Sequence, residues 1–127
     1  MKLVLLLKVF IVGQLLAASH AEACKCGKES FSVKFNNASL VFLGTSIPDA
    51  KGKYLFKIKK VWKGKIREDD FVHTSEDCGY HFHPKTDYVV FADTKSGKIS
   101  TDMCSGSAPS TPTLLKWLDE NRPAGKQ

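Results

Sequence analysis

Residues 54–64, YLFKIKKVWKG, give the clearest indication of how this chain folds. Tyr54, Phe56 and Ile58 recur at every second position, which is the pattern of a half-buried β-strand. The apolar phase then slips by one residue at Lys59–Lys60. A slip of one residue predicts a β-bulge and a sharply bent strand.

The sequence on either side of this strand predicts four more strands. Compact runs rich in strand-forming residues lie at 39–47, 68–74, 87–92 and 98–104, and turn residues lie at 49–53 and 95–97. Five short strands, one of them bent, favour a sheet that closes on itself and so has no free edge.

Two helices are expected beside these strands. Phe31 and Phe35, four residues apart, favour a short helix over residues 29–37. Thr111 can cap a second helix with Pro112 at its first position, and its apolar face would comprise Leu114, Leu115, Trp117 and Leu118. The predicted fold is therefore all-β with flanking helices: a closed five-stranded OB-fold barrel with a short N-terminal helix and a C-terminal helix.

The first 23 residues have the order of a secretory signal peptide. Lys2 precedes an apolar run from Leu3 to Leu16, and small residues lead to an Ala-x-Ala ending at Ala23. This run is too short to span a membrane, and no later segment is apolar enough to do so. We expect a secreted monomer with a signal peptide over 1–23, one domain over 24–120 and a flexible tail over 121–127.

A bacterial source would leave two other locations open. Such a protein could be periplasmic, or it could be anchored by a lipid on Cys24. Ala21 and Glu22 fit the lipidation signal poorly, because that signal requires an aliphatic residue three positions before the cysteine and small residues between. Release into the extracellular space is the preferred expectation.

The chain is moderately basic. Cleavage after Ala23 would remove Lys2, Lys8 and Glu22, reducing 19 basic and 13 acidic residues to 17 and 12, a net charge near +5. The lysines alternate with apolar residues at strand spacing, whereas a nucleic-acid interface would gather basic residues with exposed aromatic side chains. We expect no nucleic-acid partner, while attraction to polyanionic glycans stays open.

All four cysteines follow the expected cleavage site: Cys24, Cys26, Cys78 and Cys104. An even number in a short exported domain predicts two disulfides. A bridge between Cys24 and Cys26 would close a cramped ring across one residue, so each is expected to pair with a distant cysteine, in either of two arrangements. A zinc site is disfavoured because Cys78 and Cys104 do not belong to close cysteine pairs.

The remaining polar residues suggest little chemistry. His81 and His83 would share one face of a strand, and His73 lies nearby in sequence, but no acidic residue or cysteine completes a metal site. We therefore expect exposed loop histidines and no cofactor of the protein's own. No nucleophile motif is present, so an enzyme is not expected. Asn37 begins an N-glycosylation triplet, Asn37–Ala38–Ser39, which matters in a eukaryotic source.

Six segments occur in an order and spacing that together are specific. They are CKC at 24–26, VFLGT at 41–45, YLFKIKKVWKG at 54–64, EDCGYHF at 76–82, YVVFA at 88–92 and TDMCSGSAP at 101–109. This combination resembles the N-terminal domain of the tissue inhibitors of metalloproteinases (TIMPs), within the netrin-like (NTR) group. The resemblance runs from Cys24 to about Leu118, and the family's third disulfide has no counterpart here.

The resemblance implies an OB barrel, the disulfides Cys24–Cys78 and Cys26–Cys104, and inhibition of zinc metalloproteinases. Inhibitors of this family chelate the catalytic zinc of the protease through the α-amino nitrogen and carbonyl oxygen of their first residue, the position of Cys24 after cleavage. A catalytic zinc keeps one position open for water, which such a chelate can displace. The ordinary pKa of an α-amine, about 7.7–8.0, makes its deprotonation easy near neutral pH.

The resemblance also implies which residues contact the protease: Cys24, Lys25, Cys26, Ser75, Glu76, Asp77 and Cys78. The family's second residue enters the main specificity pocket, where inhibitors of animal matrix proteases usually carry a small hydroxylated residue. Lys25 must be desolvated or matched by a carboxylate, so it predicts an altered target or lost activity. The alternative function is a netrin-like adhesion or polyanion-binding module whose N-terminus is only structural.

Overall fold

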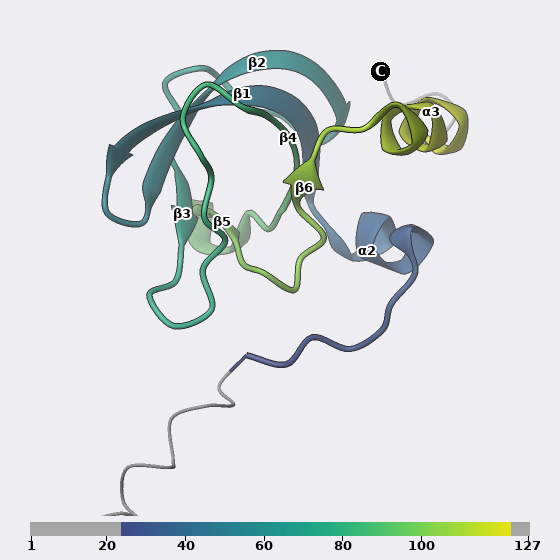
Figure 1. Ribbon diagram of the computed structural model, residues 1–127, viewed down its shortest axis with the longest axis horizontal. Helices are drawn as coiled ribbons and strands as arrows, with labels where there is room; N and C mark the ends of the chain where they lie inside the picture. The colour runs from purple at the N-terminus through teal and green to yellow at the C-terminus, as the bar shows by residue number, and fades with distance from the viewer. Residues whose placement is uncertain (1–23, 123–127) are drawn as a thin grey trace, which may run out of the picture.

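The computed structural model describes residues 24–122, and Figure 1 shows how its elements are arranged. The expected signal peptide, 1–23, and most of the expected tail, 123–127, lie outside the described residues. In chain order the elements are α2 (Phe31–Asn37), β1 (Leu40–Ala50), β2 (Lys53–Lys63), β3 (Val72–Thr74), β4 (Asp87–Ala92), the 3₁₀ turn η1 (Lys95–Gly97), β5 (Ile99–Thr101), β6 (Ala108–Pro109) and α3 (Pro112–Asn121).

The strands form one curled, barrel-like sheet (Figure 1) in the order β5-β3-β2-β1-β4-β6. All neighbours are antiparallel except β3 and β5. The two sides of the curl approach each other at Asp93 and Ser100, which exchange two backbone hydrogen bonds of 2.8 and 2.9 Å. The predicted closed five-stranded OB-fold barrel is therefore wrong in detail, because the sheet has six strands and is joined there by a single bridge rather than a full ladder.

Two strands are shorter than predicted, and this explains the incomplete closure. The segment expected to begin β3 turns instead, because Asp70 Oδ2 accepts a hydrogen bond of 2.8 Å from Arg67 N. The segment expected to extend β5 turns at Asp102, whose Oδ1 accepts from Cys104 N at 2.8 Å. Short polar side chains that bind nearby backbone N–H groups compete with a sheet ladder, and here they leave three residues in each strand.

The bulge predicted in β2 is confirmed. Leu43 lies opposite Lys60 whereas the next residue, Gly44, lies opposite Ile58, so Lys59 is the extra residue. A second register shift, between Val41 and Phe42, leaves Trp62 unpaired in the same way. Each extra residue increases the local bend, which lets one continuous strand follow the curled sheet.

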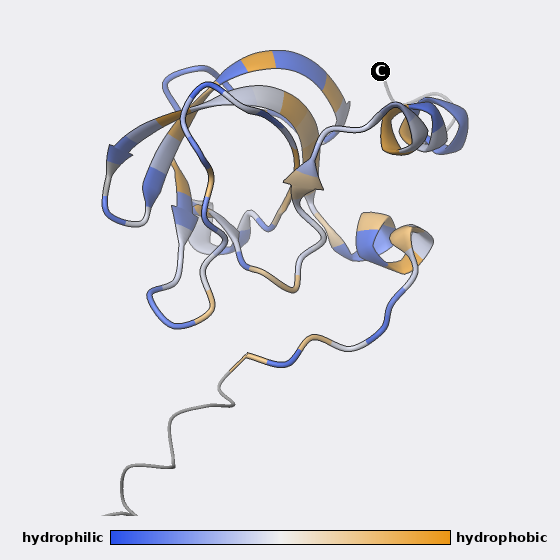
Figure 2. Ribbon diagram, in the orientation of Figure 1, coloured by the Kyte–Doolittle hydropathy of each residue, from blue (hydrophilic) through white to orange (hydrophobic). Residues whose placement is uncertain are grey.

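The bulges also divide the buried side chains between two cores. Inside the curl, Phe42, Phe56 and Phe82 pack edge to face with ring centroids 5.1–5.2 Å apart. On the outer face, Val41 and Trp62 pack with residues of the two helices. Residues 40–42 of β1 and 88–92 of β4 are buried on both faces of the sheet, which explains their unbroken apolar runs. Figure 2 shows this concentration of apolar residues along the strands and on the inward sides of the helices.

Both predicted helices are confirmed, and so is the predicted Thr111 cap of the second, while the Ser30 cap of the first was not predicted. Ser30 Oγ accepts from Val33 N in α2, and Thr111 Oγ1 accepts from Leu114 N in α3. Leu118 of α3 is fully buried, which contributes roughly 1.5–3 kcal/mol. The helices therefore cover the outer face of the sheet on the side shared by β1 and β4.

Candidate functional site

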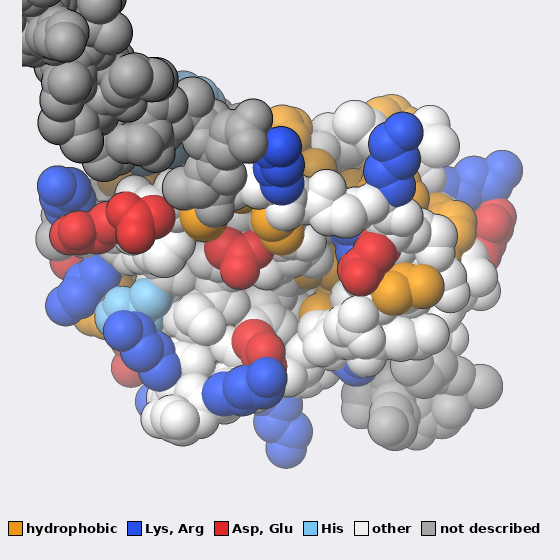
Figure 3. Space-filling view, turned by 90° about the horizontal axis from the view of Figure 1, so that it is seen from below, with side chains coloured by type: hydrophobic (Ala, Val, Ile, Leu, Met, Phe, Trp, Pro, Cys, Tyr) orange, Lys and Arg blue, Asp and Glu red, His pale blue; other side chains and the backbone are white. Residues whose placement is uncertain are grey.

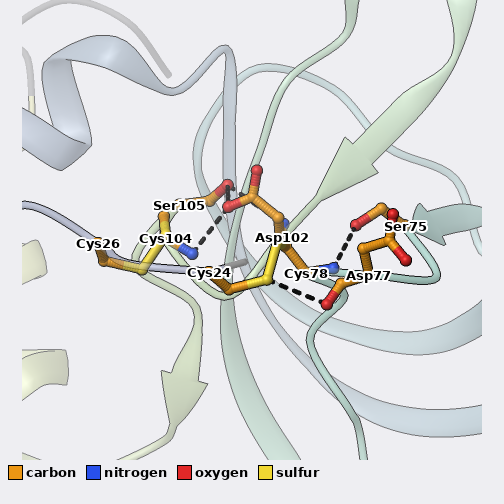
Figure 4. Close-up of a disulfide and its surroundings, with 8 residues drawn as sticks. All are labelled: Cys24, Cys26, Ser75, Asp77, Cys78, Asp102, Cys104 and Ser105. Carbon is orange, nitrogen blue, oxygen red and sulfur yellow. Dashed lines mark hydrogen bonds between the residues drawn. A yellow bond between two sulfur atoms is a disulfide. The ribbon is translucent and has the colours of Figure 1, made fainter. Parts of the chain in front are cut away.

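Residues 24–30, which precede α2, have no regular structure, and two disulfides attach them to the domain. Cys24 is bonded to Cys78 with 5.6 Å between their Cα atoms, and Cys26 to Cys104 with 5.1 Å. Figure 4 shows the two bridges side by side. These are the pairings that the family resemblance implies, and one of the two arrangements that covalent geometry leaves open.

The first bridge reaches a tight loop after β3. Ser75 Oγ accepts a hydrogen bond of 3.1 Å from Cys78 N, which closes the loop over Glu76 and Asp77. The next residue is Gly79, where any Cβ would overlap the carbonyl oxygen of Ser75. A residue without a side chain is therefore required for the chain to leave Cys78 so close to the start of the loop.

The second bridge reaches the turn after β5, which Asp102 organises. Asp102 Oδ1 accepts from Cys104 N at 2.8 Å and from Ser105 Oγ at 3.0 Å. The Ser105 hydroxyl oxygen in turn accepts from Asp102 N at 3.2 Å. This reciprocal pair of residues fixes the direction in which Cys104 presents its sulfur (Figure 4).

The two loops are joined directly to each other. Met103 N donates a hydrogen bond of 3.0 Å to Cys78 O. Cys24 Sγ lies 3.0 Å from Asp77 O, a close sulfur–oxygen contact rather than a hydrogen bond, because a disulfide sulfur carries no proton to donate. Residues 24–26, 75–78 and 102–104 thus form one continuous structural unit, which we call the cysteine edge.

The cysteine edge is largely accessible to solvent. Lys25, Cys26 and the three residues 75–77 are exposed, while Cys24 and Cys78 are half-buried. Met103 is an exposed large apolar side chain, with 48% of its surface accessible. Figure 3, which views the molecule from below, shows acidic and basic side chains interspersed on this side rather than separated by sign. Such a surface offers backbone atoms, mixed charges and one apolar side chain to a partner.

All seven residues expected to contact a protease lie on the cysteine edge: Cys24, Lys25, Cys26, Ser75, Glu76, Asp77 and Cys78. Sequence reasoning missed Asp102 and Met103, which complete it. A signal for Asp102 was present, because aspartate often accepts from the N–H two residues later in a turn. Nothing local in the sequence indicated that Met103 would bind the backbone of a loop 25 residues earlier.

The three histidines do not form a metal site, although His73 and His81 line the same surface hollow. His81 and His83 are exposed in the loop before β4, as expected, but His73 is half-buried on β3. Burial, and then the charges of Lys98 and Lys53, lower the pKa of His73. Within residues 24–122, no three His, Cys, Asp or Glu side chains are grouped to hold a metal ion.

The predicted glycosylation acceptor lies far from these loops in the sequence. Asn37 is exposed at the end of α2. The hydroxyl of Ser39, the third residue of the triplet, donates to Asp93 Oδ1 at 2.9 Å. The acceptor amide is thus accessible on the surface, and modification there stays a prediction.

None of the helices described in residues 24–122 is long and apolar enough to cross a membrane. A comparison with models of known protein families finds no match, and a search of curated proteins finds no significant similarity. The geometry of the cysteine edge is therefore the basis for assigning a function.

Proposed function

We propose that this chain is a secreted inhibitor of zinc metalloproteinases, similar to the N-terminal domain of the TIMPs. Cleavage after Ala23 would make Cys24 the first residue. Its amine nitrogen and carbonyl oxygen would then bind the catalytic zinc of the protease in place of water. The inhibitor has no zinc of its own and no catalytic residue in this proposal.

The observation that carries the proposal is the double attachment of residues 24–26. Two disulfides within three residues hold this segment against two loops that are distant in the sequence. A segment already fixed before association loses little conformational freedom when it binds. Two covalent bonds therefore fix a segment that lies outside any helix or strand, which favours a role in presenting the backbone of Cys24.

The charged residues around Cys24 could contact a protease next to its catalytic zinc. Lys25 follows Cys24 on the exposed side, and Glu76 and Asp77 lie on the adjoining loop. An amine that leaves cleavage with a pKa of about 7.7–8.0 is partly neutral at physiological pH and can donate its electron pair to a metal. Lys25 would extend toward the specificity pocket, and we expect a target whose pocket contains a carboxylate to balance it.

The test compares two forms of the disulfide-bonded protein that differ by one residue. One begins at Cys24 and the other carries an additional alanine before it, and both are assayed against a panel of zinc metalloproteinases. The extension converts the amine to an amide, which cannot coordinate the metal. We expect at least a hundredfold loss of inhibition, since an inhibitor without its metal ligand loses several kcal/mol. A form with the same alanine added at the C-terminus is the matched control.

Two results would contradict the proposal. Equal inhibition by the extended and unextended forms would show that the amine is not a ligand. If neither form inhibited any protease in the panel, the proposed inhibition would be wrong and the cysteine edge would have only a structural role. Mass spectrometry of the secreted protein establishes whether Cys24 is the natural first residue.

A further inference from the structure

A second feature of the surface lies between the β1–β2 turn, β3 and the start of β5. It is a surface hollow of about 240 Å³. Its charged and imidazole-bearing lining residues are Lys51, Lys53, His73, Glu76, His81 and Lys98. We call it the basic pocket. Figure 3 shows imidazole and lysine side chains next to each other toward the left of that view.

The lysines of the basic pocket are not paired with acidic side chains. In the part of the chain that the structure describes, no carboxylate lies within 4.0 Å of the amines of Lys51, Lys53 or Lys98. Other lysines also lack such a partner, but these three line one hollow, whereas Lys59 is paired with Asp87 at 2.6 Å. Lys53 Nζ has an aromatic neighbour, the ring of Phe71, with its centroid at 5.3 Å. The pocket thus gathers positive charge that the protein does not balance.

The electrostatic environment of His73 agrees with this. Burial is the largest cause that lowers the pKa of the His73 imidazole, and the positive charges of Lys98 and Lys53 follow. Both amines therefore act on the same part of the pocket. With neutral imidazoles, three lysines and one glutamate leave the lining with a net charge of +2. A doubly negative ligand would match that charge, and a singly charged carboxylate would not.

The pocket is also held in shape. Thr74 N donates to Gly52 O at 2.9 Å, which fixes the β1–β2 turn against β3. Gly52 has φ of +74°, and a Cβ there would lie 3.2 Å from Thr74 O. Ser75 Oγ accepts from Cys78 N, which leaves the proton of its hydroxyl to donate elsewhere. A neutral donor beside several cations is a common arrangement for binding oxoanions.

We propose that the basic pocket binds a tetrahedral dianion, namely phosphate or the phosphate group of a small monoester. A phosphate monoester carries about −1.5 to −2 charges at pH 7, whereas a sulfate monoester carries one. The volume of the pocket exceeds that of a bare ion, which favours an ester whose carrier fills the remaining space. The site shares Ser75 and Glu76 with the cysteine edge, but no residue of 24–26 lines it, so phosphate binding there does not require cleavage at Ala23.

The experiment follows backbone amide signals by NMR in a phosphate-free buffer at constant ionic strength. Inorganic phosphate, glucose 6-phosphate and glucose 6-sulfate are titrated separately into the disulfide-bonded protein. We expect saturable shifts at Gly52, His73 and Lys98. Glucose 6-phosphate should bind about tenfold more tightly than the sulfate ester, which has the same carrier but half the charge.

Two double variants with the same change in net charge provide the matched comparison. Lys53→Gln with Lys98→Gln removes two amines from the pocket, and Lys57→Gln with Lys65→Gln removes two exposed amines outside it. The first pair should weaken binding of glucose 6-phosphate by about tenfold or more, and the second by less than about twofold. Thermal unfolding of both variants establishes that each is folded.

The results distinguish a phosphate ester from free phosphate as the ligand, and some of them would contradict the proposal. Tighter binding of the phosphate ester than of inorganic phosphate identifies an ester as the ligand, and equal binding identifies the free ion. Equal affinity for the phosphate and sulfate esters would overturn the selection for a dianion. Shifts that do not saturate, or equal weakening in both double variants, would show general screening by lysines and no site.

Discussion

At the scale of single residues, Gly79 determines whether the loop of the cysteine edge can form. We predict that Gly79→Ala destabilises the protein by about 1–3 kcal/mol, because its Cβ would overlap backbone rather than a flexible side chain. The measurement is the denaturant midpoint of the disulfide-bonded protein. A thermal or chemical midpoint equal to that of the parent would show that the loop can move without cost.

Gly27 provides the matched control for this substitution. It lies between the same N-terminal segment and α2, and a Cβ there would meet no heavy atom within 4 Å. Gly27→Ala should therefore leave the midpoint unchanged or raise it slightly, since alanine restricts the unfolded chain more than glycine does. Equal destabilisation by both substitutions would contradict the steric explanation.

Asp87 is a second residue with a measurable role, because it connects the first residue of β4 to the bulge of β2. Its carboxylate accepts from Lys59 Nζ and Thr45 Oγ1, both at 2.6 Å, and these bonds, the one from Lys59 first, lower its pKa. A lowered pKa in the folded state stabilises the protein above the unfolded value of about 3.9 and ceases to do so as the pH falls through the folded value. Asp87→Asn should therefore cost about 1 kcal/mol near neutral pH, a modest value because the side chain is 35% exposed.

The same prediction has a pH signature. The difference in free energy of unfolding between the parent and Asp87→Asn should shrink in acid, once the parent carboxyl is protonated. Asp49→Asn is the control, because Asp49 is exposed and its side chain has no hydrogen bond or ion pair in the described part of the chain. A difference that stays constant from neutral to acid pH would exclude the charge of Asp87 as its cause.

At the scale of elements, the sequence was informative wherever one periodic pattern dominated. The phase slip at Lys59–Lys60 predicted the bulge, and Thr111 with Pro112 predicted the start of α3. β6 was missed because it has two residues and contains Pro109, which fits only at a sheet edge. The lengths of β3 and β5 could not be predicted, since their ends depend on which backbone N–H groups Asp70 and Asp102 bind.

β1, in contrast, is longer than the sequence predicted. It continues to Ala50, beyond the expected end at residue 47, although it contains Pro48. Its pairing with β4 ends at Thr45, so beyond that point β1 has β2 as its only ladder partner. Proline is tolerated where one side of a strand is unpaired. That arrangement is a property of the assembled sheet, and local sequence does not contain it.

At the scale of the whole molecule, the disulfides are expected to provide much of the stability. Their cysteines are 54 and 78 residues apart, and closing loops of this length stabilises a domain by about 4 kcal/mol each in the chain-entropy model. We predict that replacing Cys26 and Cys104 together by serine lowers the free energy of unfolding by about this amount. Denaturant unfolding under non-reducing conditions measures it, and a loss below about 1 kcal/mol would contradict the prediction.

The pair Cys24 and Cys78 serves as the internal comparison. Its replacement by serine should cost a similar amount, because loop-closure entropy grows only slowly with length. Losing both bridges should cost more than the sum of the two single losses, since each bridge shortens the loop that the other closes and so reduces the cost of losing one alone. A cost equal to the sum would indicate that the bridges constrain separate parts of the domain.

The candidate site could be predicted from sequence only as far as its covalent connections. The cysteines and the loop 75–77 come together because two bridges require it. The contribution of Met103 depends on one backbone hydrogen bond between distant loops, and the basic pocket depends on the approach of three segments that have no shared motif. Such features follow from the curvature of the sheet rather than from local pattern.

Because only one residue separates Cys24 from Cys26, the pairing of the disulfides depends on the order in which the four cysteines are synthesised. The ribosome produces both thiols first, then Cys78, and Cys104 only 26 residues later. When Cys78 appears, either early thiol can reach it, and only the completion of β5 supplies the partner that makes one choice correct. Correct pairing therefore depends on thiol–disulfide exchange or on oxidation that is slow enough to wait for Cys104.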